Sequence, residues 1–260
     1  MTPTDLKIAM FPQEIKWGDK AANIDTLIDI SSHLHPETDL LILPETFSTG
    51  FITGRDKEQL RVLAERNTGK TIDTVKAIAK ARGIAIAGSF IADSGGLLYN
   101  RAFFIEPNGE ETFADKRHLF SMAGEHKIFS RGNEKMNVRF RGWNIAMIVC
   151  YDIRFPIWCR NRMNEYDLLI GVANWPKVRA NAWNLLLQAR AIENEAYVAG
   201  VNCSGTDDHD IAYDGDTHAF DFKGKDLAIR DEATGILYAR LDYGKLQAFR
   251  EKFPAWRDAD

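Results

Sequence analysis

Apolar residues recur along the chain with two periods, one typical of buried strands and the other of helices that pack on one face. Helical spacing predicts helices over residues 19–34, 69–81 and 180–191, with Gly83 as the C-terminal cap of the second. Short apolar runs predict strands at residues 6–11, 40–43, 84–91, 98–105, 111–114, 137–140, 143–149, 167–172 and 196–201. Further short strands are predicted near the C-terminus at residues 217–222, 226–230 and 234–241.

Turn-forming residues separate these elements without dividing the chain into parts. Pro107-Asn108-Gly109 lies between two predicted strands and predicts a hairpin, because Asn-Gly readily adopts the positive φ of a tight turn. No low-complexity linker and no close internal repeat is found, so residues 1–260 are expected to form a single domain. Strands outnumber helices and do not alternate strictly with them, which favours a layered α/β sandwich over a barrel or a Rossmann fold.

Composition and charge narrow the class of protein. The chain has 33 Lys and Arg residues and 37 Asp and Glu residues, which give a net charge of −4. Because binding to a phosphate backbone usually needs a basic surface, we expect a small-molecule substrate and no nucleic-acid partner. The apolar runs are far shorter than the roughly 20 residues of a membrane helix, and the N-terminus lacks a secretory pattern. Three cysteines are an odd number in a chain too long to need disulfides, so we expect a cytoplasmic protein with a free thiol available for chemistry.

Three predicted strands end in a reactive side chain, which is where layered α/β enzymes commonly place their sites. Glu45 follows the strand at 40–43, Lys116 follows 111–114, and Cys150 follows 143–149. Taken singly, each has a plainer interpretation, namely a solvated glutamate, a surface lysine and a core cysteine. Cys159 and Cys203 lie in a helix-like run and a turn and are interpreted as non-catalytic.

Taken together, the sequences around these positions match one known constellation. The segments are Leu43-Pro44-Glu45, Asp115-Lys116-Arg117-His118-Leu119 and Cys150-Tyr151-Asp152-Ile153-Arg154-Phe155-Pro156. In order and context they resemble the nitrilase superfamily of carbon–nitrogen hydrolases. The resemblance implies a Glu-Lys-Cys triad on a four-layer αββα sandwich, with Glu125 at the position of the family's second glutamate. Within the superfamily the chain most resembles the omega-amidases, especially bacterial ones, through residues 116–126, 150–161, 172–176, 188–194 and 249–256.

This resemblance implies amide hydrolysis through a thioester on Cys150. Glu45 would act first as general base and then as general acid. Lys116 and the backbone N–H of Tyr151 would form the oxyanion hole, and Glu125 would orient Lys116 and the incoming substrate. Lys116 favours the thiolate form of Cys150, whereas burial beside two carboxylates opposes it, so the sequence leaves the resting state of the thiol open.

The omega-amidase resemblance also implies a substrate class, the side-chain amides of 2-oxo acids such as 2-oxoglutaramate and 2-oxosuccinamate. The acid end of such a substrate needs a cationic or amide group that binds a carboxylate. The candidates for substrate contact are Tyr151, Arg154, Asn174, Trp175 and His126. Two of them have plainer interpretations, since Arg154 could pair with Asp152 and Trp175 could belong to the core.

Other assignments stay open beside this one. Within the superfamily the alternatives are an N-carbamoyl or aliphatic amide hydrolase and a nitrilase, and outside catalysis a binding protein that keeps the fold. The mechanism needs no metal and no cofactor, and the six histidines lack the spacing of metal ligands. Neither nucleotide-binding glycine motif occurs, nor does the G-x-S-x-G elbow of serine hydrolases. The resemblance implies a homodimer.

Overall fold

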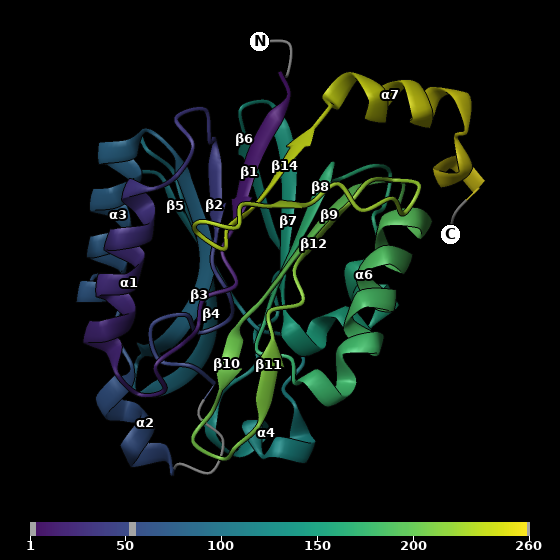
Figure 1. The fold of residues 1–260 in the computed structure, drawn as a ribbon. Helices are drawn as coiled ribbons and strands as arrows, with labels where there is room; N and C mark the ends of the chain where they lie inside the picture. The colour runs from purple at the N-terminus through teal and green to yellow at the C-terminus, as the bar shows by residue number, and fades with distance from the viewer. Residues whose placement is uncertain (1–3, 52–55, 259–260) are drawn as a thin grey trace.

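The computed structural model describes residues 4–51 and 56–258. Among these residues, strands form a seven-stranded sheet, a five-stranded sheet and a two-stranded pair. The two larger sheets face each other and helices cover their outer faces, so the layers follow the order αββα (Figure 1). The four-layer α/β sandwich expected from the sequence is confirmed.

The seven-stranded sheet combines the N-terminal half of the chain with two strands from near its C-terminus. Its strands are β1 (Leu6–Met10), β2 (Leu40–Ile42), β3 (Ala85–Ser94), β4 (Leu97–Ile105), β5 (Glu111–Asp115), β13 (Ile229–Arg230) and β14 (Leu237–Leu241). They lie in the order β13-β14-β1-β2-β3-β4-β5, with β1, β2 and β3 parallel. The hairpin predicted at residues 107–109 joins β4 and β5, and Gly109 has the positive φ of 95° that the turn requires.

The five-stranded sheet is built by the middle of the chain. Its strands are β6 (Met136–Phe140), β7 (Trp143–Val149), β8 (Leu168–Ala173), β9 (Tyr197–Asn202) and β12 (His218–Phe220), in the order β12-β9-β8-β7-β6. β7, β8 and β9 are parallel. The remaining pair, β10 (Ser204–Thr206) and β11 (Ala212–Asp214), forms a hairpin beyond the end of β9.

Helices cover the two outer faces of the sandwich. α1 (Lys20–Ser32), α2 (Lys57–Leu63) and α3 (Lys70–Arg82) lie on the side of the seven-stranded sheet, and α6 (Ala180–Glu193) lies on the side of the other (Figure 1). Gly83 ends α3 in the left-handed conformation, as predicted. Short helices α4 (Glu125–Ile128) and α5 (Pro156–Cys159) and the 3-10 helices Ser121–Ala123, Cys150–Arg154, Lys177–Arg179 and Ala255–Asp258 occupy connections. In the described part of the chain, no helix is both long and apolar enough to cross a membrane.

The central strands are buried on both faces, which explains their unbroken apolar sequences. In β7, Ile145, Met147 and Val149 pack between the two sheets. Ala146 and Ile148 of the same strand pack on the other face, in a cluster that includes residues of α6. Because successive side chains of a strand point to opposite faces, one strand contributes to both apolar layers. This packing holds the two sheets together, so the strand ends at one edge of the sandwich keep their positions relative to each other.

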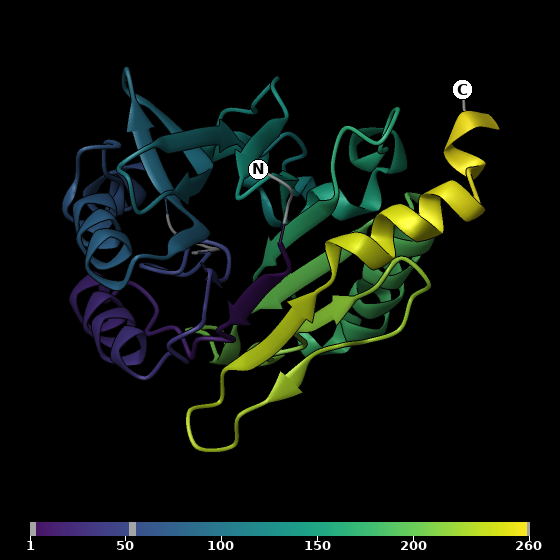
Figure 2. The same cartoon turned by 90° about the horizontal axis from the view of Figure 1, so that it is seen from above.

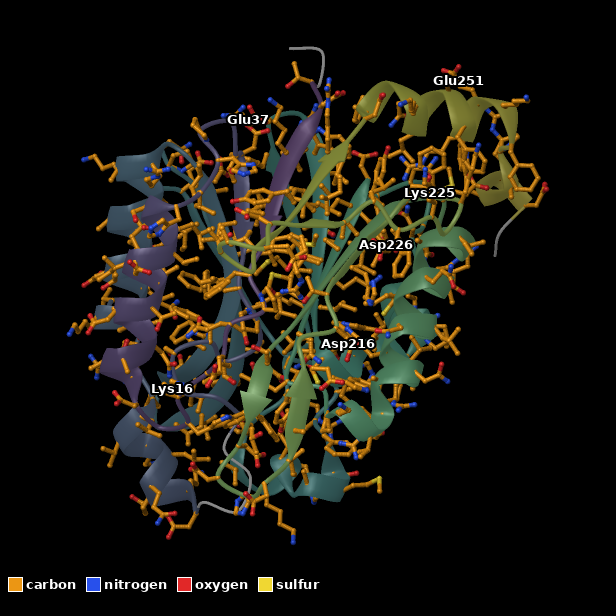
Figure 3. The ribbon with its side chains drawn as sticks, viewed as in Figure 1. Lys16, Glu37, Asp216, Lys225, Asp226 and Glu251 are labelled. Atoms are coloured by element: carbon orange, nitrogen blue, oxygen red, sulfur yellow. The ribbon has the colours of Figure 1, made fainter. Side chains whose placement is uncertain are left out.

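The C-terminal region differs from the prediction. The strands predicted at residues 217–222, 226–230 and 234–241 are shorter, as β12, β13 and β14, and the helix α7 (Tyr243–Lys252) was not predicted. In the N-terminal half of the chain, α2 was not predicted either. Seen from above, α7 runs alongside the sandwich (Figure 2). A buried charge anchors α7, because Arg250 donates to Asp167 Oδ1 (2.7 Å) and to the backbone carbonyls of Glu195 and Tyr166. The neighbouring Glu251 points outward (Figure 3). Apolar contacts add to this anchor, since Leu246 is buried in the core and Tyr243 and Phe249 pack against it.

Candidate active site

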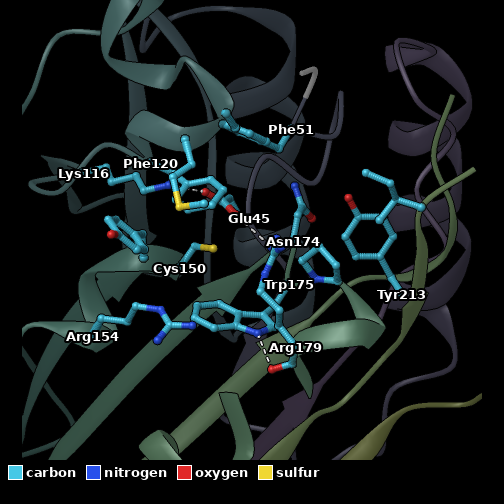
Figure 4. A pocket seen from close by; sticks show the side chains of 15 residues that line it. Glu45, Phe51, Lys116, Phe120, Cys150, Arg154, Asn174, Trp175, Arg179 and Tyr213 are labelled. Carbon is cyan, nitrogen blue, oxygen red and sulfur yellow. Dashed lines mark hydrogen bonds and ion pairs between the residues drawn. The ribbon is translucent and has the colours of Figure 1, made fainter. Parts of the chain in front are cut away.

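The three reactive residues singled out in the sequence meet at one edge of the sandwich (Figure 4). Glu45 follows β2 and Lys116 follows β5 in one sheet, while Cys150 follows β7 in the other. Lys116 Nζ lies 3.0 Å from Glu45 Oε1 and 3.0 Å from Glu125 Oε1. Glu45, Lys116 and Glu125 are buried, whereas Cys150 is partly exposed in the pocket. The structure therefore brings the four residues together as expected.

Hydrogen bonds fix the Glu45 carboxylate in place. Its Oε1 accepts from Asn100 Nδ2 (2.7 Å) as well as from Lys116, and its Oε2 accepts from the backbone N–H of Asn174 (2.8 Å). Asn100 is held in turn by the Ser89 hydroxyl, which donates to Asn100 Oδ1 (3.0 Å). Both sheets thus contribute donors to one carboxylate, and its orientation does not depend on substrate.

Lys116 is held as a cation between two carboxylates. Burial by itself would lower the pKa of Lys116, but the charges of Glu125 and Glu45 outweigh it and hold that pKa well above its ordinary value. Burial raises the pKa of Glu125, and the Glu45 charge adds to that rise, although Lys116 opposes it. A permanent positive charge at this position suits the stabilisation of an oxyanion.

Cys150 sits on a sharp turn from β7 into the 3-10 helix Cys150–Arg154. Its φ of 47° is in the left-handed region, which a non-glycine residue adopts only when its surroundings enforce it. The buried Asp152 carboxylate supplies that constraint, because it accepts from the backbone N–H groups of Val149 (3.2 Å) and His118 (2.8 Å). His118 Nδ1 also lies 2.8 Å from Asp152 Oδ1. The turn at Cys150 is therefore tied to the segment that carries Lys116.

The resting form of the Cys150 thiol follows from its surroundings. Burial raises the pKa of Cys150 well above its usual value, and the Glu45 carboxylate raises it further, while Lys116 opposes both. These surroundings favour the neutral thiol over the thiolate, with Glu45 beside it to accept the proton.

A pocket of about 620 Å³ opens over these groups. Its lining consists of Glu45, Phe51, Lys116, Phe120, Met122, Ala123, Cys150, Tyr151, Arg154, Asn174, Trp175, Pro176, Arg179, Ile211 and Tyr213. Four of the residues expected to contact substrate, namely Tyr151, Arg154, Asn174 and Trp175, are among them. Phe120, Arg179 and Tyr213 were not anticipated. Tyr213 comes from the β10–β11 hairpin, for which the sequence carried no signal.

The expectation for His126 is wrong. Its side chain is exposed on α4 and does not line the pocket, although Glu125, one residue earlier, is buried against Lys116. Successive side chains of a helix point about 100° apart. His126 therefore lies on a different face of α4 from Glu125, although the two residues are neighbours in sequence. Arg154 does not pair with Asp152 either, because the Asp152 carboxylate is occupied by Val149 and His118.

Two guanidinium groups line the pocket without a carboxylate partner among the described residues. Arg154 lies over the ring of Trp175 at 4.9 Å, and Arg179 lies over the ring of Phe120 at 5.6 Å. Trp175 is itself fixed, because its indole N–H donates to the Arg179 carbonyl (2.8 Å). Aromatic faces orient guanidinium planes while leaving their N–H donors available. The pocket can therefore receive an anionic group. In the described part of the chain, no group of three or more His, Cys, Asp or Glu side chains is placed to hold a metal ion.

Comparisons with known proteins agree with this geometry. The model of the carbon-nitrogen hydrolase family matches residues 7–251. The chain is 41% identical over 259 residues to the omega-amidase YafV of Escherichia coli K12, covering 98% of this chain and 97% of that protein. It is 32% identical to the 2-oxoglutaramate amidase of Bacillus subtilis, with 94% of each chain covered.

Among solved structures, the chain is similar to a CN-hydrolase superfamily protein of Xanthomonas campestris, whose structure has an arsenic adduct in the active site. The two superpose with a TM-score of 0.92 at 38% sequence identity, and the match covers 98% of this chain and 97% of that one. Yeast Nit3, a member of branch 10 of the nitrilase superfamily, shares the fold with a TM-score of 0.84 at 23% identity, covering 96% and 95% of the two chains. With its family-wide match and these relatives, the chain belongs to the carbon-nitrogen hydrolase family of the nitrilase superfamily and is a carbon–nitrogen hydrolase.

Proposed function

We propose that this protein is an omega-amidase, which releases ammonia from the side-chain amide of a 2-oxo acid such as 2-oxoglutaramate or 2-oxosuccinamate. The observation that carries the proposal is a pocket that joins Glu45, Lys116 and Cys150 to two guanidinium groups that have no carboxylate partner among the described residues. The first set suits amide hydrolysis, and the second suits a substrate with an anionic far end. The omega-amidase and 2-oxoglutaramate amidase among the relatives support the same substrate class.

In the first half-reaction, Cys150 Sγ bonds to the amide carbon as its proton passes to Glu45. The carbonyl oxygen becomes an oxyanion, which Lys116 Nζ and the backbone N–H of Tyr151 stabilise. The C–N bond then breaks, the proton on Glu45 passes to the leaving nitrogen, and ammonia departs while the acyl group stays on Cys150 as a thioester.

In the second half-reaction, water attacks the thioester. Glu45 takes a proton from the water, the same oxyanion hole holds the new tetrahedral centre, and the C–S bond breaks to release the acid. The Cys150 thiol recovers its proton from Glu45, so no group is consumed. Glu125 keeps the Lys116 ammonium in position throughout, since its carboxylate is fixed by the backbone N–H of Phe120.

Arg154 and Arg179 would bind the acid end of the substrate. Each guanidinium lies over an aromatic ring at the pocket, which leaves its N–H donors free to meet a carboxylate. An α-ammonium group, as in glutamine, would lie near two cations and meet no unpaired carboxylate there. The pocket therefore favours the 2-oxo acid amide over the corresponding amino acid.

We also propose a cytoplasmic homodimer. All three cysteines are free in the structure, which suits a reducing compartment. Large apolar side chains are exposed on α5, on the 3-10 helix Lys177–Arg179 and on α6, namely Ile157 (82%), Val178 (86%) and Leu185 (56%). Apolar exposure of this kind is typical of a surface that a second subunit covers. Light scattering coupled to size-exclusion chromatography measures the assembly, and a monomeric mass at micromolar concentration would overturn it.

A single assay tests the activity. Ammonia release is compared for 2-oxoglutaramate, glutamine, an N-carbamoyl amino acid, a short aliphatic amide and a simple nitrile. We expect 2-oxoglutaramate to have the highest kcat/KM, whereas preference for any of the others would assign a different branch of the superfamily. Cys150→Ala is expected to abolish turnover, while Cys159→Ala, a matched change at a buried thiol outside the pocket, is expected to retain it.

A further inference from the structure

Asn174 occupies a special place in the pocket because it touches the catalytic carboxylate through its backbone and faces the pocket with its side chain. It follows β8 directly, and its backbone N–H donates to Glu45 Oε2 (2.8 Å). The side chain is 6% exposed and lines the pocket. Figure 4 shows Lys116 and Asn174 on opposite sides of Glu45. If the oxyanion lies on the Lys116 side, the leaving nitrogen lies on the Asn174 side.

The orientation of the Asn174 amide is set by its neighbour Thr46. Asn174 Nδ2 donates to Thr46 Oγ1 (3.0 Å), which turns the other end of the amide away from Thr46. Thr46 has a φ of 43°, rare for a β-branched residue, and its backbone N–H is fixed by the Ser89 hydroxyl (2.8 Å). A strained and rigidly held threonine thus serves as the anchor of one side-chain amide.

The other end of that amide has no partner. Asn174 Oδ1 is buried and accepts no hydrogen bond from any described residue. Buried acceptors are normally satisfied, so an unsatisfied one on a residue that lines a pocket points to a donor that arrives with the ligand. Beside it, Glu45 Oε2 accepts one hydrogen bond within the described part of the chain, whereas Oε1 already accepts two. Both acceptors belong to residues that line the pocket and that the hydrogen bond from the Asn174 backbone to Glu45 joins directly.

We propose that Asn174 determines specificity for primary carboxamides by accepting, through Oδ1, an N–H of the scissile –NH2 group. This inference rests on the proposed amidase function and deepens it. A primary amide nitrogen carries two N–H groups, and Oδ1 and Glu45 Oε2 supply two acceptors for them. In the tetrahedral intermediate, the bond to Oδ1 turns the nitrogen lone pair toward the proton on Glu45, the C–N bond breaks, and ammonia leaves with that proton.

The same arrangement discriminates against related substrates. An ester, a nitrile and an N,N-dialkyl amide bring no N–H, so each of them leaves Asn174 Oδ1 unsatisfied in a pocket from which water is displaced. The preference therefore concerns the reacting end of the substrate and is separate from the recognition of its acid end by Arg154 and Arg179.

Paired substrates test this inference. The amide that the wild type hydrolyses fastest is compared with the methyl ester of the same acid, in the wild type and in Asn174→Leu, a change that keeps side-chain size and removes both polar atoms. We expect kcat/KM for the amide to fall about 10- to 100-fold, at least fivefold more than for the ester. An equal loss for both substrates, or a greater loss for the ester, would overturn the proposal, because a merely structural role moves the two together.

A second pair of variants keeps the proposal testable if Asn174→Leu does not fold. Thr46→Val removes the hydroxyl that orients Asn174, and Thr46→Ser keeps it. We expect the amide-to-ester ratio to fall in the valine variant and to change less in the serine variant; equal ratios would count against the inference. A wild type that hydrolyses no primary amide would instead refute the proposed function, so the two failures are distinguishable.

Discussion

Replacing Lys116 by methionine should damage stability and activity for separable reasons. The ammonium lies 3.0 Å from each of two buried carboxylates, and methionine has a similar shape without the charge. Removing one partner of a buried ion pair typically costs about 3–5 kcal/mol of unfolding free energy. Losing an oxyanion donor costs about 3–4 kcal/mol of transition-state stabilisation, or roughly a hundred- to a thousandfold in kcat.

The two carboxylates do not share this cost equally. Glu45 keeps the donors Asn100 and Asn174, whereas Glu125 keeps only the Phe120 backbone N–H among the described residues. The pKa of Glu125 is already raised by burial and rises further without Lys116. A carboxyl with a raised folded-state pKa stabilises the fold at low pH and loses that contribution as pH rises through it. The destabilisation of Lys116→Met should therefore be smallest near about pH 5 and grow toward about pH 8.

The double variant Lys116→Met/Glu125→Gln separates the two effects. Glutamine keeps an acceptor for Phe120 and removes the charge, so we expect about half or more of the lost unfolding free energy to return at pH 8. Turnover should stay at least a hundredfold below the wild type, because the oxyanion cation is still missing. Urea denaturation and ammonia release measure the two quantities. An unchanged unfolding free energy in Lys116→Met, or turnover regained in the double variant, would refute the reasoning.

Three further changes test other parts of the structure. Arg250→Ala leaves Asp167 buried without its cation and should lower the unfolding free energy by about 3–5 kcal/mol, measured by urea denaturation. Arg154→Gln and Arg179→Gln should each raise KM for 2-oxoglutaramate about tenfold with a smaller change in kcat, in steady-state assays. Because burial and Glu45 raise the pKa of Cys150, its alkylation in the resting protein should be slow at pH 7 and accelerate above about pH 9, followed by mass spectrometry.

Each of these has a matched control or a contrary result. Lys252→Ala, at an exposed position of the same helix as Arg250, should change stability by less than about 0.5 kcal/mol. For the arginines, equal KM effects on a neutral amide of similar size would contradict carboxylate binding. For Cys150, fast alkylation at pH 6 would show that the thiolate predominates, contrary to the direction argued from burial.

The sequence predicted most of the layered core because its strands are buried on both faces and carry unbroken apolar runs. Glu45 and Cys150 each follow such a run, whereas Lys116 follows the partly exposed strand β5 and was singled out through the family resemblance of the sequence around it. The helix α7 was missed because its apolar positions Tyr243, Leu246 and Phe249 lie among charged residues in a segment of ten residues, and its anchor at Arg250 is a tertiary contact. Pocket residues such as Tyr213 come from loops whose path depends on tertiary contacts. His126 shows the converse error, in which nearness along the chain was taken for nearness in space.

The proposed catalytic groups come from two different sheets, and this origin affects how the site responds to partial unfolding. Glu45 and Lys116 follow strands of the seven-stranded sheet, whereas Cys150 and Asn174 follow strands of the five-stranded sheet. The hydrogen bond between Glu45 and Asn174 therefore connects the two sheets. Any sliding of one sheet over the other by a fraction of a side chain would separate nucleophile from base while both sheets stayed intact. Turnover therefore depends on how the two sheets are aligned. As the urea concentration or the temperature rises, we expect catalysis to be lost before circular dichroism records a loss of secondary structure.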